Sequence, residues 1–377
     1  MFVSRWLVAL AVMLVGAVGQ ANAGHWSVRE ILHEISRSSV VRQATAEFYS
    51  SRGALCCRKG EIDKGIRDFA EAIRLDPRNP LYYNNRGHAW QAKKEYDKAI
   101  GDFDRAIELD PRDAVSYQNR AFAWHLKKDY EKATADLDRA IQLDPRDARP
   151  YHNRGVIWQD KKEYDKAMAD FDRAIQLDPR HAGAYHGRGF AWGGKGEYDK
   201  AIADFDRAIQ LDPRYARAYH DRGYAWKAKG EYEKAIADFD RTIQLDPRYA
   251  PAYLDRGIVW KAKGNYEKAM ADLDRAIQLD PHCASAYNNR AWLRATCRDE
   301  RFRDGRKAVQ DATQACNLTG WKNCGHIDTL AAAYAEAGEF DEAVKWEKKV
   351  SELAPQNRLG EVRSRLKLYQ NRRPYRE

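Results

Sequence analysis

Apolar and small residues recur three, four and seven positions apart along most of the chain, a spacing that predicts amphipathic α-helices. The pattern itself repeats, because seven consecutive segments of 34 residues align without a gap between positions 46 and 283. Position 4 is Tyr in every segment, position 8 is Gly or Ala, and position 11 is Trp in all but the first, which has Cys56. Gly or Ala at position 20 and Phe or Leu at position 24 mark a second apolar stripe. We therefore predict two helices per segment.

Each segment also carries its own stop signal. Asp-Pro stands at positions 31 and 32, as in RAIQLDPR at 173–180. The proline ring disfavours helical geometry in the residue before it, so the second helix should end there. Pairs such as Lys229-Gly230 supply the turn between the two helices. Small residues at positions 8 and 20 should let the paired helices approach closely, with Tyr and Trp filling the flanks.

These columns resemble the tetratricopeptide repeat, whose pattern is W-x2-L-G-x2-Y, then A-x3-F, then P, with a period of 34 residues. Here the pattern reads Y-x2-R-G-x2-W, A-x3-F and P, as in Tyr185, Arg188, Gly189, Trp192, Ala201, Phe205 and Pro213. The resemblance implies an all-α fold: a right-handed superhelical α-solenoid of about nine helix-turn-helix repeats with a C-terminal capping helix.

The predicted organisation covers the whole chain. The regular repeats are expected at 46–79, 80–113, 114–147, 148–181, 182–215, 216–249 and 250–283. A degenerate eighth repeat with an insertion follows at 284–323, and a ninth at 324–355. Residues 24–45 are expected to form an N-terminal capping helix, and residues 356–377 a basic C-terminal capping helix and tail.

The first 23 residues resemble a secretory signal peptide. Arg5 precedes the uncharged apolar run 6–18, and Ala21-Asn22-Ala23 forms a small-x-small cleavage site. We expect cleavage near Ala23/Gly24 and a bacterial protein that is exported, periplasmic or secreted. The alternative is that the apolar run is kept as a membrane anchor, although it is shorter than the roughly 20 residues that a spanning helix needs.

The formal charge of +9 is concentrated at one end of the chain. Residues 80–283 carry 36 basic and 35 acidic side chains, whereas residues 356–377 carry seven basic and two acidic. A nucleic-acid-binding array needs a basic face, so we expect no nucleic-acid partner. The basic tail makes contact with an anionic membrane surface a second possibility.

Arg replaces the usual Leu at position 7 of the repeats. We predict that these arginines form a ladder with the aspartates at positions 23 and 25, for example Asp204 and Asp206, because a residue present in every repeat cannot specify one ligand. The ladder residues are Arg86, Arg120, Arg154, Arg188, Arg222 and Arg256.

By the same resemblance, first helices line a concave groove that binds a peptide or helix of a partner protein. Residues that vary between repeats at the groove-facing positions are the candidate site. They are Asn84, His88, Gln118, Phe122, Arg149, His152, Val156, His186, Phe190, Arg217, His220, Tyr224, Lys227, Leu254, Ile258 and Lys261. The apolar strip at position 9, which includes Phe190 and Tyr224, is open to two interpretations: packing within the array or an exposed track for a partner.

Three consecutive repeats have histidine at position 5: His152, His186 and His220. Equivalent atoms in neighbouring repeats should lie about 10 Å apart, whereas zinc ligands must lie about 2.1 Å from one ion. We therefore predict no metal site, and interpret the histidines as hydrogen-bonding groups of the groove that gain a proton at acid pH.

No motif in the sequence indicates catalysis. The chain contains no phosphate-binding loop, nucleophile elbow or H-E-x-x-H motif, and we predict neither enzymatic activity nor a cofactor. The lysines of a carboxylate clamp for chaperone tails are also missing. In an oxidising compartment Cys316 and Cys324 could close a short disulfide loop. We predict a non-catalytic protein-binding scaffold; the alternatives are a membrane-associated envelope assembly factor that uses the basic tail, or an enzyme without a recognisable motif.

Overall fold

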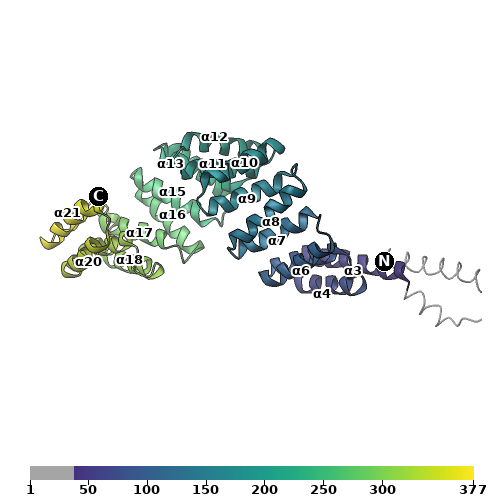
Figure 1. Ribbon diagram of the computed structural model, residues 1–377. Helices are drawn as coiled ribbons and strands as arrows, with labels where there is room; N and C mark the ends of the chain where they lie inside the picture. The colour runs from purple at the N-terminus through teal and green to yellow at the C-terminus, as the bar shows by residue number, and fades with distance from the viewer. Residues whose placement is uncertain (1–37) are drawn as a thin grey trace, which may run out of the picture. The chain divides into compact units, whose positions relative to one another are not determined.

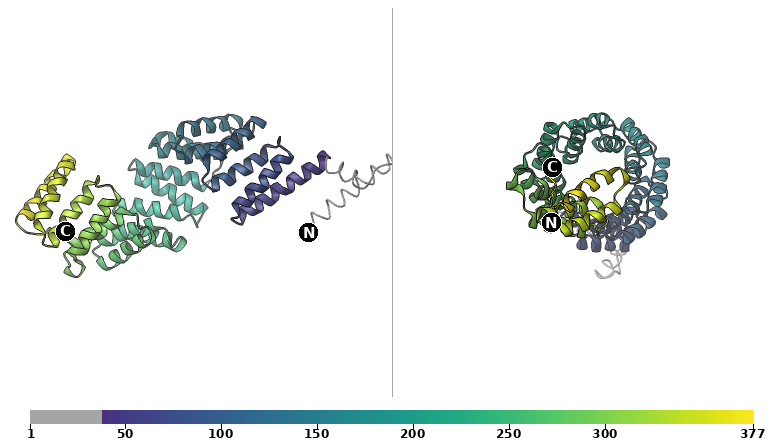
Figure 2. Two further views of the ribbon diagram at one scale, coloured as in Figure 1. Left: turned by 90° about the horizontal axis from the view of Figure 1, so that it is seen from below. Right: turned by 90° about the vertical axis from the view of Figure 1, so that its left-hand side faces the viewer.

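The computed structural model describes residues 38–377, and within them all regular structure is helical. The signal peptide expected at 1–23 and most of the capping helix expected at 24–45 lie outside the described residues. The chain divides between Pro179 and Arg180 into two compact bodies, an N-terminal body and a C-terminal body. In each body, consecutive helices pack as antiparallel pairs and the pairs stack in chain order (Figures 1 and 2).

The N-terminal body contains four helix pairs. Its first helix begins at Ser39, so the described part of the expected N-terminal cap is continuous with the first repeat. The helices are α3 (Ser39–Arg58), α4 (Ile62–Leu75), α5 (Pro80–Ala92), α6 (Tyr96–Leu109), α7 (Ala114–Leu126), α8 (Tyr130–Leu143), α9 (Ala148–Asp160) and α10 (Tyr164–Leu177).

The C-terminal body contains five helix pairs and a final single helix. Regular pairs are α11 (Ala182–Gly194) and α12 (Tyr198–Leu211), α13 (Ala216–Ala228) and α14 (Tyr232–Leu245), and α15 (Ala250–Ala262) and α16 (Tyr266–Leu279). The degenerate pairs are α17 (Ala284–Thr296) with α18 (Gly305–Leu318), and α19 (Cys324–Glu336) with α20 (Phe340–Leu353). The insertion before α18 forms a short 3-10 turn, Glu300–Phe302, and α21 (Leu359–Gln370) packs on α20 as the expected final helix.

The helix boundaries follow from the predicted signals. The aspartate before each proline leaves the helical region, as Asp212 does with φ −133° and ψ 92°. Gly230 occupies the turn between α13 and α14 with φ 78°, a left-handed conformation that costs glycine little. Lys128 and Lys162 occupy the same turn position in other repeats, also with positive φ.

Close packing within a pair depends on the absence of a side chain at position 8. A Cβ added to Gly87 would lie 2.5 Å from Cε1 of Phe103, which is fully buried. In the third repeat both positions change together, because Ala121 lies over Leu137 and both are buried. In these two repeats the residue at position 8 therefore matches the size of the side chain at position 24.

The Trp column lies at the edge of the core rather than inside it. Trp226 is half-buried against Ile236 and Phe239, and the ammonium of Lys234 lies 4.4 Å from its ring centroid. Trp124 and Lys132 make the equivalent contact at 4.2 Å. A cation over the outer face and apolar side chains under the inner face together account for Trp at this position.

The predicted arginine ladder is present. Arg222 forms a bidentate ion pair with Asp238 of its own repeat, and its remaining nitrogen lies 2.5 Å from Asp206 of the preceding repeat. The prediction is confirmed with one refinement, since the position-25 partner belongs to the previous repeat. The same-repeat pairs are Arg52–Asp68, Arg86–Asp102, Arg120–Asp136, Arg154–Asp170, Arg188–Asp204, Arg222–Asp238, Arg256–Asp272 and Arg290–Asp311.

The basic tail is largely folded onto the body. Arg358 and Arg365 both pair with the buried Asp328, at 2.8 and 2.9 Å, and Arg376 lies 2.5 Å from Glu336. Three of the seven cations of residues 356–377 are therefore matched by internal carboxylates, which leaves less charge for a membrane surface. No helix within residues 38–377 combines the length and apolarity needed to cross a bilayer.

All six cysteines are free thiols. Cys316 belongs to α18 and is buried among residues of the neighbouring helices. Burial raises the pKa of its thiol to about 11. The Cys316–Cys324 disulfide that the sequence left open is absent from the structure.

Candidate partner-binding surface

The first helices expose large aromatic side chains at position 9. Phe122 on α7 is 50% exposed, Phe190 on α11 is 41% exposed and Tyr224 on α13 is 50% exposed. The neighbouring residues Ala191 and Ala225 are buried, so the helices are well packed and the rings project from them. We call Phe190 and Tyr224, which stand at position 9 of consecutive repeats of the C-terminal body, the aromatic row. Two interpretations of position 9 were open, packing within the array or exposure to a partner. The side chains of Phe122, Phe190 and Tyr224 fit the second, because they are exposed.

The other position-9 residues are less uniform. Val156, Ile258 and Trp292 are half-buried, and His88 is exposed with its Nδ1 3.2 Å from Oε1 of Gln91. Position 9 is thus apolar or aromatic in three consecutive repeats of the C-terminal body, at Phe190, Tyr224 and Ile258. Of these three side chains, Phe190 and Tyr224 are exposed.

In the N-terminal body Phe122 borders a small cavity. It has a volume of about 180 Å³ and lies between the first helices α7 and α9. Its lining is mostly apolar, with Phe122 and Val156 on the walls and Leu137 and Ile157 at the base. The space suits one apolar side chain of a bound segment. His125 stands at the edge, with Nε2 2.7 Å from Asp160.

Two residues predicted for the groove are already engaged within the array. Asn84 is buried and donates through Nδ2 to Oγ of Ser116 at 2.7 Å. Gln118 is buried and donates through Nε2 to Asp147 at 3.0 Å. Both join neighbouring first helices, so they hold the surface together and are not free to bind a partner. His152 and Leu254 are half-buried.

The C-terminal body contains a chain of hydrogen bonds across three first helices. Nε2 of His186 lies 2.8 Å from Asp221, whose other oxygen lies 2.9 Å from Nδ1 of His220. Nε2 of His220 lies 3.1 Å from Asp255, which accepts from Nζ of Lys227 at 2.6 Å. We call these five residues the His-Asp chain.

The environment of His220 changes its protonation. Burial opposes the charged imidazole, but the hydrogen bonds to Asp221 and Asp255 outweigh it and raise the pKa of His220 to about 9. Burial likewise opposes ionisation of Asp221, yet the hydrogen bonds from His186 and His220 lower its pKa to about 2. His220 is therefore protonated at neutral pH, whereas the sequence suggested protonation only in acid.

His186, His220 and Lys227 are predicted for the groove from the sequence, but their connection through Asp221 and Asp255 is not. A histidine at position 5 and an aspartate at position 6 of the next repeat are 35 residues apart, as in His186 and Asp221 or His220 and Asp255. That spacing is the available signal, because stacked repeats bring equivalent positions together. It gives His186 and His220 a structural role, which is to connect α11, α13 and α15.

The basic residues predicted for the groove have different neighbours in the structure. Arg149 pairs with Asp147 at 2.8 Å, and Arg217 is exposed. Nζ of Lys227 lies 4.2 Å from the ring centroid of Tyr224, while Nζ of Lys261 lies 3.3 Å from Glu377. Within residues 38–377, no three His, Cys, Asp or Glu side chains gather in a metal-binding arrangement.

Comparison with known proteins agrees with the repeat architecture. Family models described as "Tetratricopeptide repeat" match residues 80–113, 120–188 and 227–294, and one described as "TPR repeat" matches residues 194–230. No curated protein sequence matches the chain.

Solved structures are similar at the level of the fold. A tetratricopeptide repeat protein from Parabacteroides merdae has 22% sequence identity and a TM-score of 0.52, covering 63% of this chain and 93% of its own. PilF of Pseudomonas aeruginosa has 19% identity and a TM-score of 0.51 over 56% of this chain and 96% of its own. PilW, a type IV pilus biogenesis factor, has 19% identity and a TM-score of 0.51 over 55% of this chain and 96% of its own.

Proposed function

Because this chain belongs to the tetratricopeptide repeat family, we propose that it is a non-catalytic scaffold whose first-helix surface forms a groove for a peptide or helix of a partner protein. The observation that carries the proposal is the exposure of Phe190 and Tyr224. Both rings stand at the same position of consecutive repeats, on helices whose Ala184, Ala191, Ala218 and Ala225 are buried. Exposed aromatic side chains on a rigid support are typical binding hot spots.

The surroundings of the two rings define the partner further. Asp221 and Asp255 lie beside Arg217 and Lys227, so neither sign of charge dominates. A segment with an apolar face and charges of both signs complements this surface better than a polyanion does. The His-Asp chain fixes the relative positions of the first helices beneath the rings, which lowers the entropic cost of binding.

Crosslinking followed by affinity purification from the native extract tests the proposal. The variant Phe190→Ala with Tyr224→Ala should recover at least about tenfold less partner than wild type, since removal of two hot-spot rings costs more than 1.4 kcal/mol. The matched control is Phe48→Ala with Leu353→Ala, which removes two exposed apolar side chains outside the aromatic row. Equal recovery with the test variant and the control would contradict the proposal.

We further propose that the protein works outside the cytoplasm, on the basis of the signal-like residues 1–23. Mass spectrometry of the protein from its native host should give a mature N-terminus at Gly24. A retained Met1 in the purified protein would contradict cleavage.

A further inference from the structure

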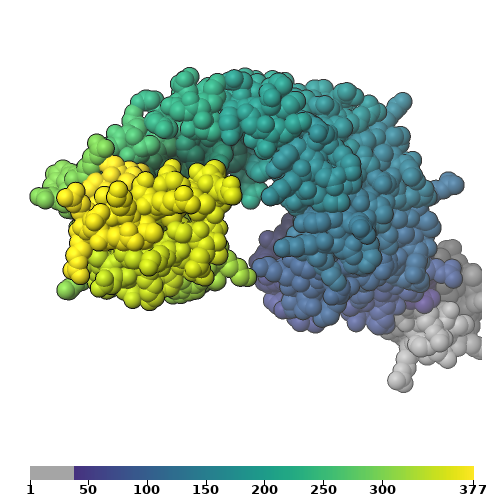
Figure 3. Space-filling model, turned by 60° about the vertical axis from the view of Figure 1, so that its left-hand side comes forward, coloured from purple at the N-terminus to yellow at the C-terminus, as the bar shows by residue number. Residues whose placement is uncertain are grey.

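The last residues of the chain lie against the first helices α15 and α17 of the C-terminal body. The backbone N–H of Glu377 donates to the carbonyl oxygen of Thr296 at 3.0 Å, and the ring of Tyr375 lies 5.9 Å from that of Trp292. The space-filling view shows this end of the chain packed against the preceding repeats (Figure 3). An extended segment of the protein thus occupies part of its own first-helix surface.

The carboxylate of Glu377 has a defined set of partners. Oε2 accepts from the indole Nε1 of Trp292 at 3.0 Å, and Oε1 lies 3.3 Å from Nζ of Lys261. Arg298 donates through Nε to the backbone carbonyl oxygen of Glu377 at 2.5 Å. We call Lys261, Trp292 and Arg298 the acid-binding site. The Glu377 side chain is 48% exposed, so the contact is open to exchange with another acidic residue.

Lys261 has no carboxylate partner from the next repeat, 284–323, in contrast to the equivalent lysine one repeat earlier, so it can pair with a carboxylate from another segment. Lys227 occupies the equivalent place one repeat earlier, and its Nζ pairs with Asp255, 28 residues further on, at 2.6 Å. The residue 28 positions after Lys261 is Asn289, which has no charge. The array therefore neutralises Lys227 internally and leaves Lys261 to a carboxylate from elsewhere.

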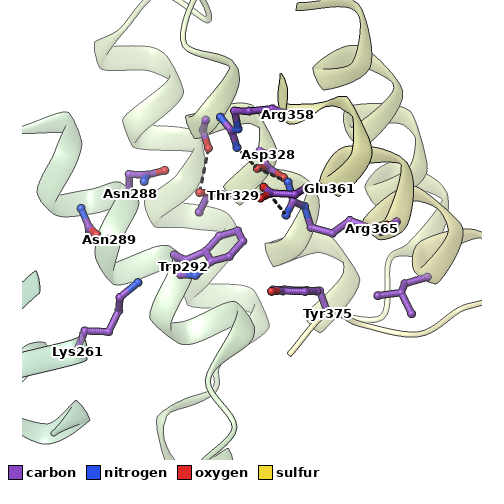
Figure 4. Close-up of a pocket in the computed structure, with 13 residues that line it drawn as sticks. Lys261, Asn288, Asn289, Trp292, Asp328, Thr329, Arg358, Glu361, Arg365 and Tyr375 are labelled. Atoms are coloured by element: carbon purple, nitrogen blue, oxygen red, sulfur yellow. Dashed lines mark hydrogen bonds and ion pairs between the residues drawn. The ribbon is translucent and has the colours of Figure 1, made fainter. Parts of the chain in front are cut away.

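The acid-binding site opens into a cavity of the C-terminal body that is about 570 Å³ in volume. Asn288, Asn289 and Lys261 lie on one side of it, and Arg358 and Arg365 on the other, with Trp292 facing Tyr375 between them (Figure 4). Within residues 38–377, no donor reaches the buried Oδ1 of Asn288. The cavity has both the room and the polar groups to hold the backbone that carries an acidic side chain.

We propose that the acid-binding site binds an extended segment of a partner protein with an aromatic residue two positions before an acidic one. The chain's own Tyr375-Arg376-Glu377 occupies the site in the same manner and competes with the partner. The proposal deepens the proposed function, on which it rests, because it assigns one end of the groove a specific chemistry. It also makes access to this end dependent on release of residues 374–377.

A labelled peptide with the sequence of residues 371–377, NRRPYRE, is the probe. It is titrated by fluorescence anisotropy into the full chain and into the variant Tyr375→Ala with Glu377→Ala (the emptied variant), which removes the two side chains that hold the segment in the site. We expect the variant to bind at least about tenfold more tightly than wild type, because a tethered segment competes at an effective concentration in the millimolar range. Circular dichroism confirms that each protein is folded.

Two controls make the test specific. Adding Lys261→Ala to the emptied variant should weaken binding about tenfold, whereas Lys263→Ala should leave it unchanged, since Lys263 pairs with Glu233 on α14. The peptide NRRPYRQ should bind about as weakly as NRRPYRE does to the Lys261→Ala protein. Phe190→Ala with Tyr224→Ala should have no effect, so this result is independent of the aromatic row.

The proposal is overturned by either of two results. One is the absence of binding to the emptied variant at about 1 mM peptide, the concentration that a tethered segment provides. The other is equal binding of NRRPYRE and NRRPYRQ, or equal binding with and without Lys261. Either result can occur while the aromatic row still binds a partner, so the two proposals fail separately.

Discussion

Arg222 and Asp238 form a bidentate ion pair between the two helices of one repeat, with Nε and Nη2 at 2.8 and 2.6 Å from the two carboxylate oxygens. Asp238 is only 8% exposed, whereas Asp206, the second partner of Arg222, belongs to the preceding repeat and is 45% exposed. One arginine thus holds its own helix pair together and also ties it to its neighbour. The two contacts differ in burial, and therefore in their expected contribution to stability.

We predict that Asp238→Asn destabilises the protein by about 3–5 kcal/mol, because it leaves a half-buried guanidinium without its main counter-charge. Asp206→Asn should cost less than about 1 kcal/mol, since that carboxylate is solvated. Urea unfolding followed by circular dichroism measures both changes. Similar losses for the two variants would show that burial does not decide the strength of the ladder.

Glycine at position 8 should be required only where Phe stands opposite. A Cβ on Gly87 would lie 2.5 Å from the buried ring of Phe103, but a Cβ on Gly257 would lie 3.3 Å from Leu273. We predict that Gly87→Ala costs about 1–3 kcal/mol through overpacking. Gly257→Ala should be close to neutral, because the better helix propensity of Ala, worth up to about 1 kcal/mol, offsets the tight contact.

Thermal unfolding of the two glycine variants checks this prediction. The cost of Gly87→Ala should shrink in a Phe103→Leu background, which reproduces the Ala121 and Leu137 combination of the third repeat. If Gly87→Ala costs as much stability in the Phe103→Leu background as in the wild type, contact with Phe103 is not the source of the strain.

His220 should make stability depend on pH in the alkaline range. Its pKa rises from about 6.5 in the unfolded chain to about 9 in the folded protein, so the folded state binds the proton more tightly. The stabilisation, on the order of 3 kcal/mol, is fully present below pH 6.5 and is lost as the pH rises through 9. Besides Asp221 and Asp255, the rings of Phe239 and Tyr249 pack against His220.

The variant His220→Gln isolates this contribution. The difference in urea midpoint between wild type and variant should be largest at pH 6 and should shrink towards pH 9.5. A difference that does not vary with pH would contradict a protonated His220 in the folded protein. Lys227 and His186 remain in the variant and keep their aspartate partners.

Glu347 on α20 should have a related effect at the C-terminal end. Burial, and then the neighbouring charge of Asp328, raise the pKa of Glu347 to about 8, so the folded protein holds this carboxyl protonated. The stability it contributes is full below pH 4.5 and declines as the pH rises through 8.

We expect Glu347→Gln to be more stable than wild type at pH 8.5 and equal to it near pH 4.5. Hydrogen exchange of α19 to α21 measures the effect where it arises. Lower protection of α21 in the variant at pH 8.5 would contradict this account, since Gln keeps the shape of the protonated acid without its charge.

Much of the molecule is determined by the sequence alone, because its signals are local or periodic. Asp-Pro at the end of each repeat, the small residues at position 8 and the charge pair of Arg222 and Asp238 follow from spacing within one or two repeats. Stacking of identical units converts such short-range patterns directly into a core. The helix pairs and the arginine ladder can therefore be predicted from the sequence.

The candidate surface could be predicted only in part. The sequence identifies position 9 as a groove-facing position. Whether Phe190 is exposed there depends on how closely the next first helix approaches. Its position in the repeat predicts that Asn84 lies in the groove, yet it is buried, and Ser116 of the next repeat provides a hydrogen-bond partner. Neither outcome is encoded within a single repeat.

Only the tertiary structure decided the protonation of His220 and the use of Lys261. His220 depends on two carboxylates from two other repeats, in a site from which water is largely excluded, and electrostatic effects of that kind follow distance and burial rather than sequence order. Lys261 meets Glu377 across 116 positions of sequence. A contact so distant in the chain forms only because the final segment turns back onto the stacked helices, and no repeat pattern specifies that return.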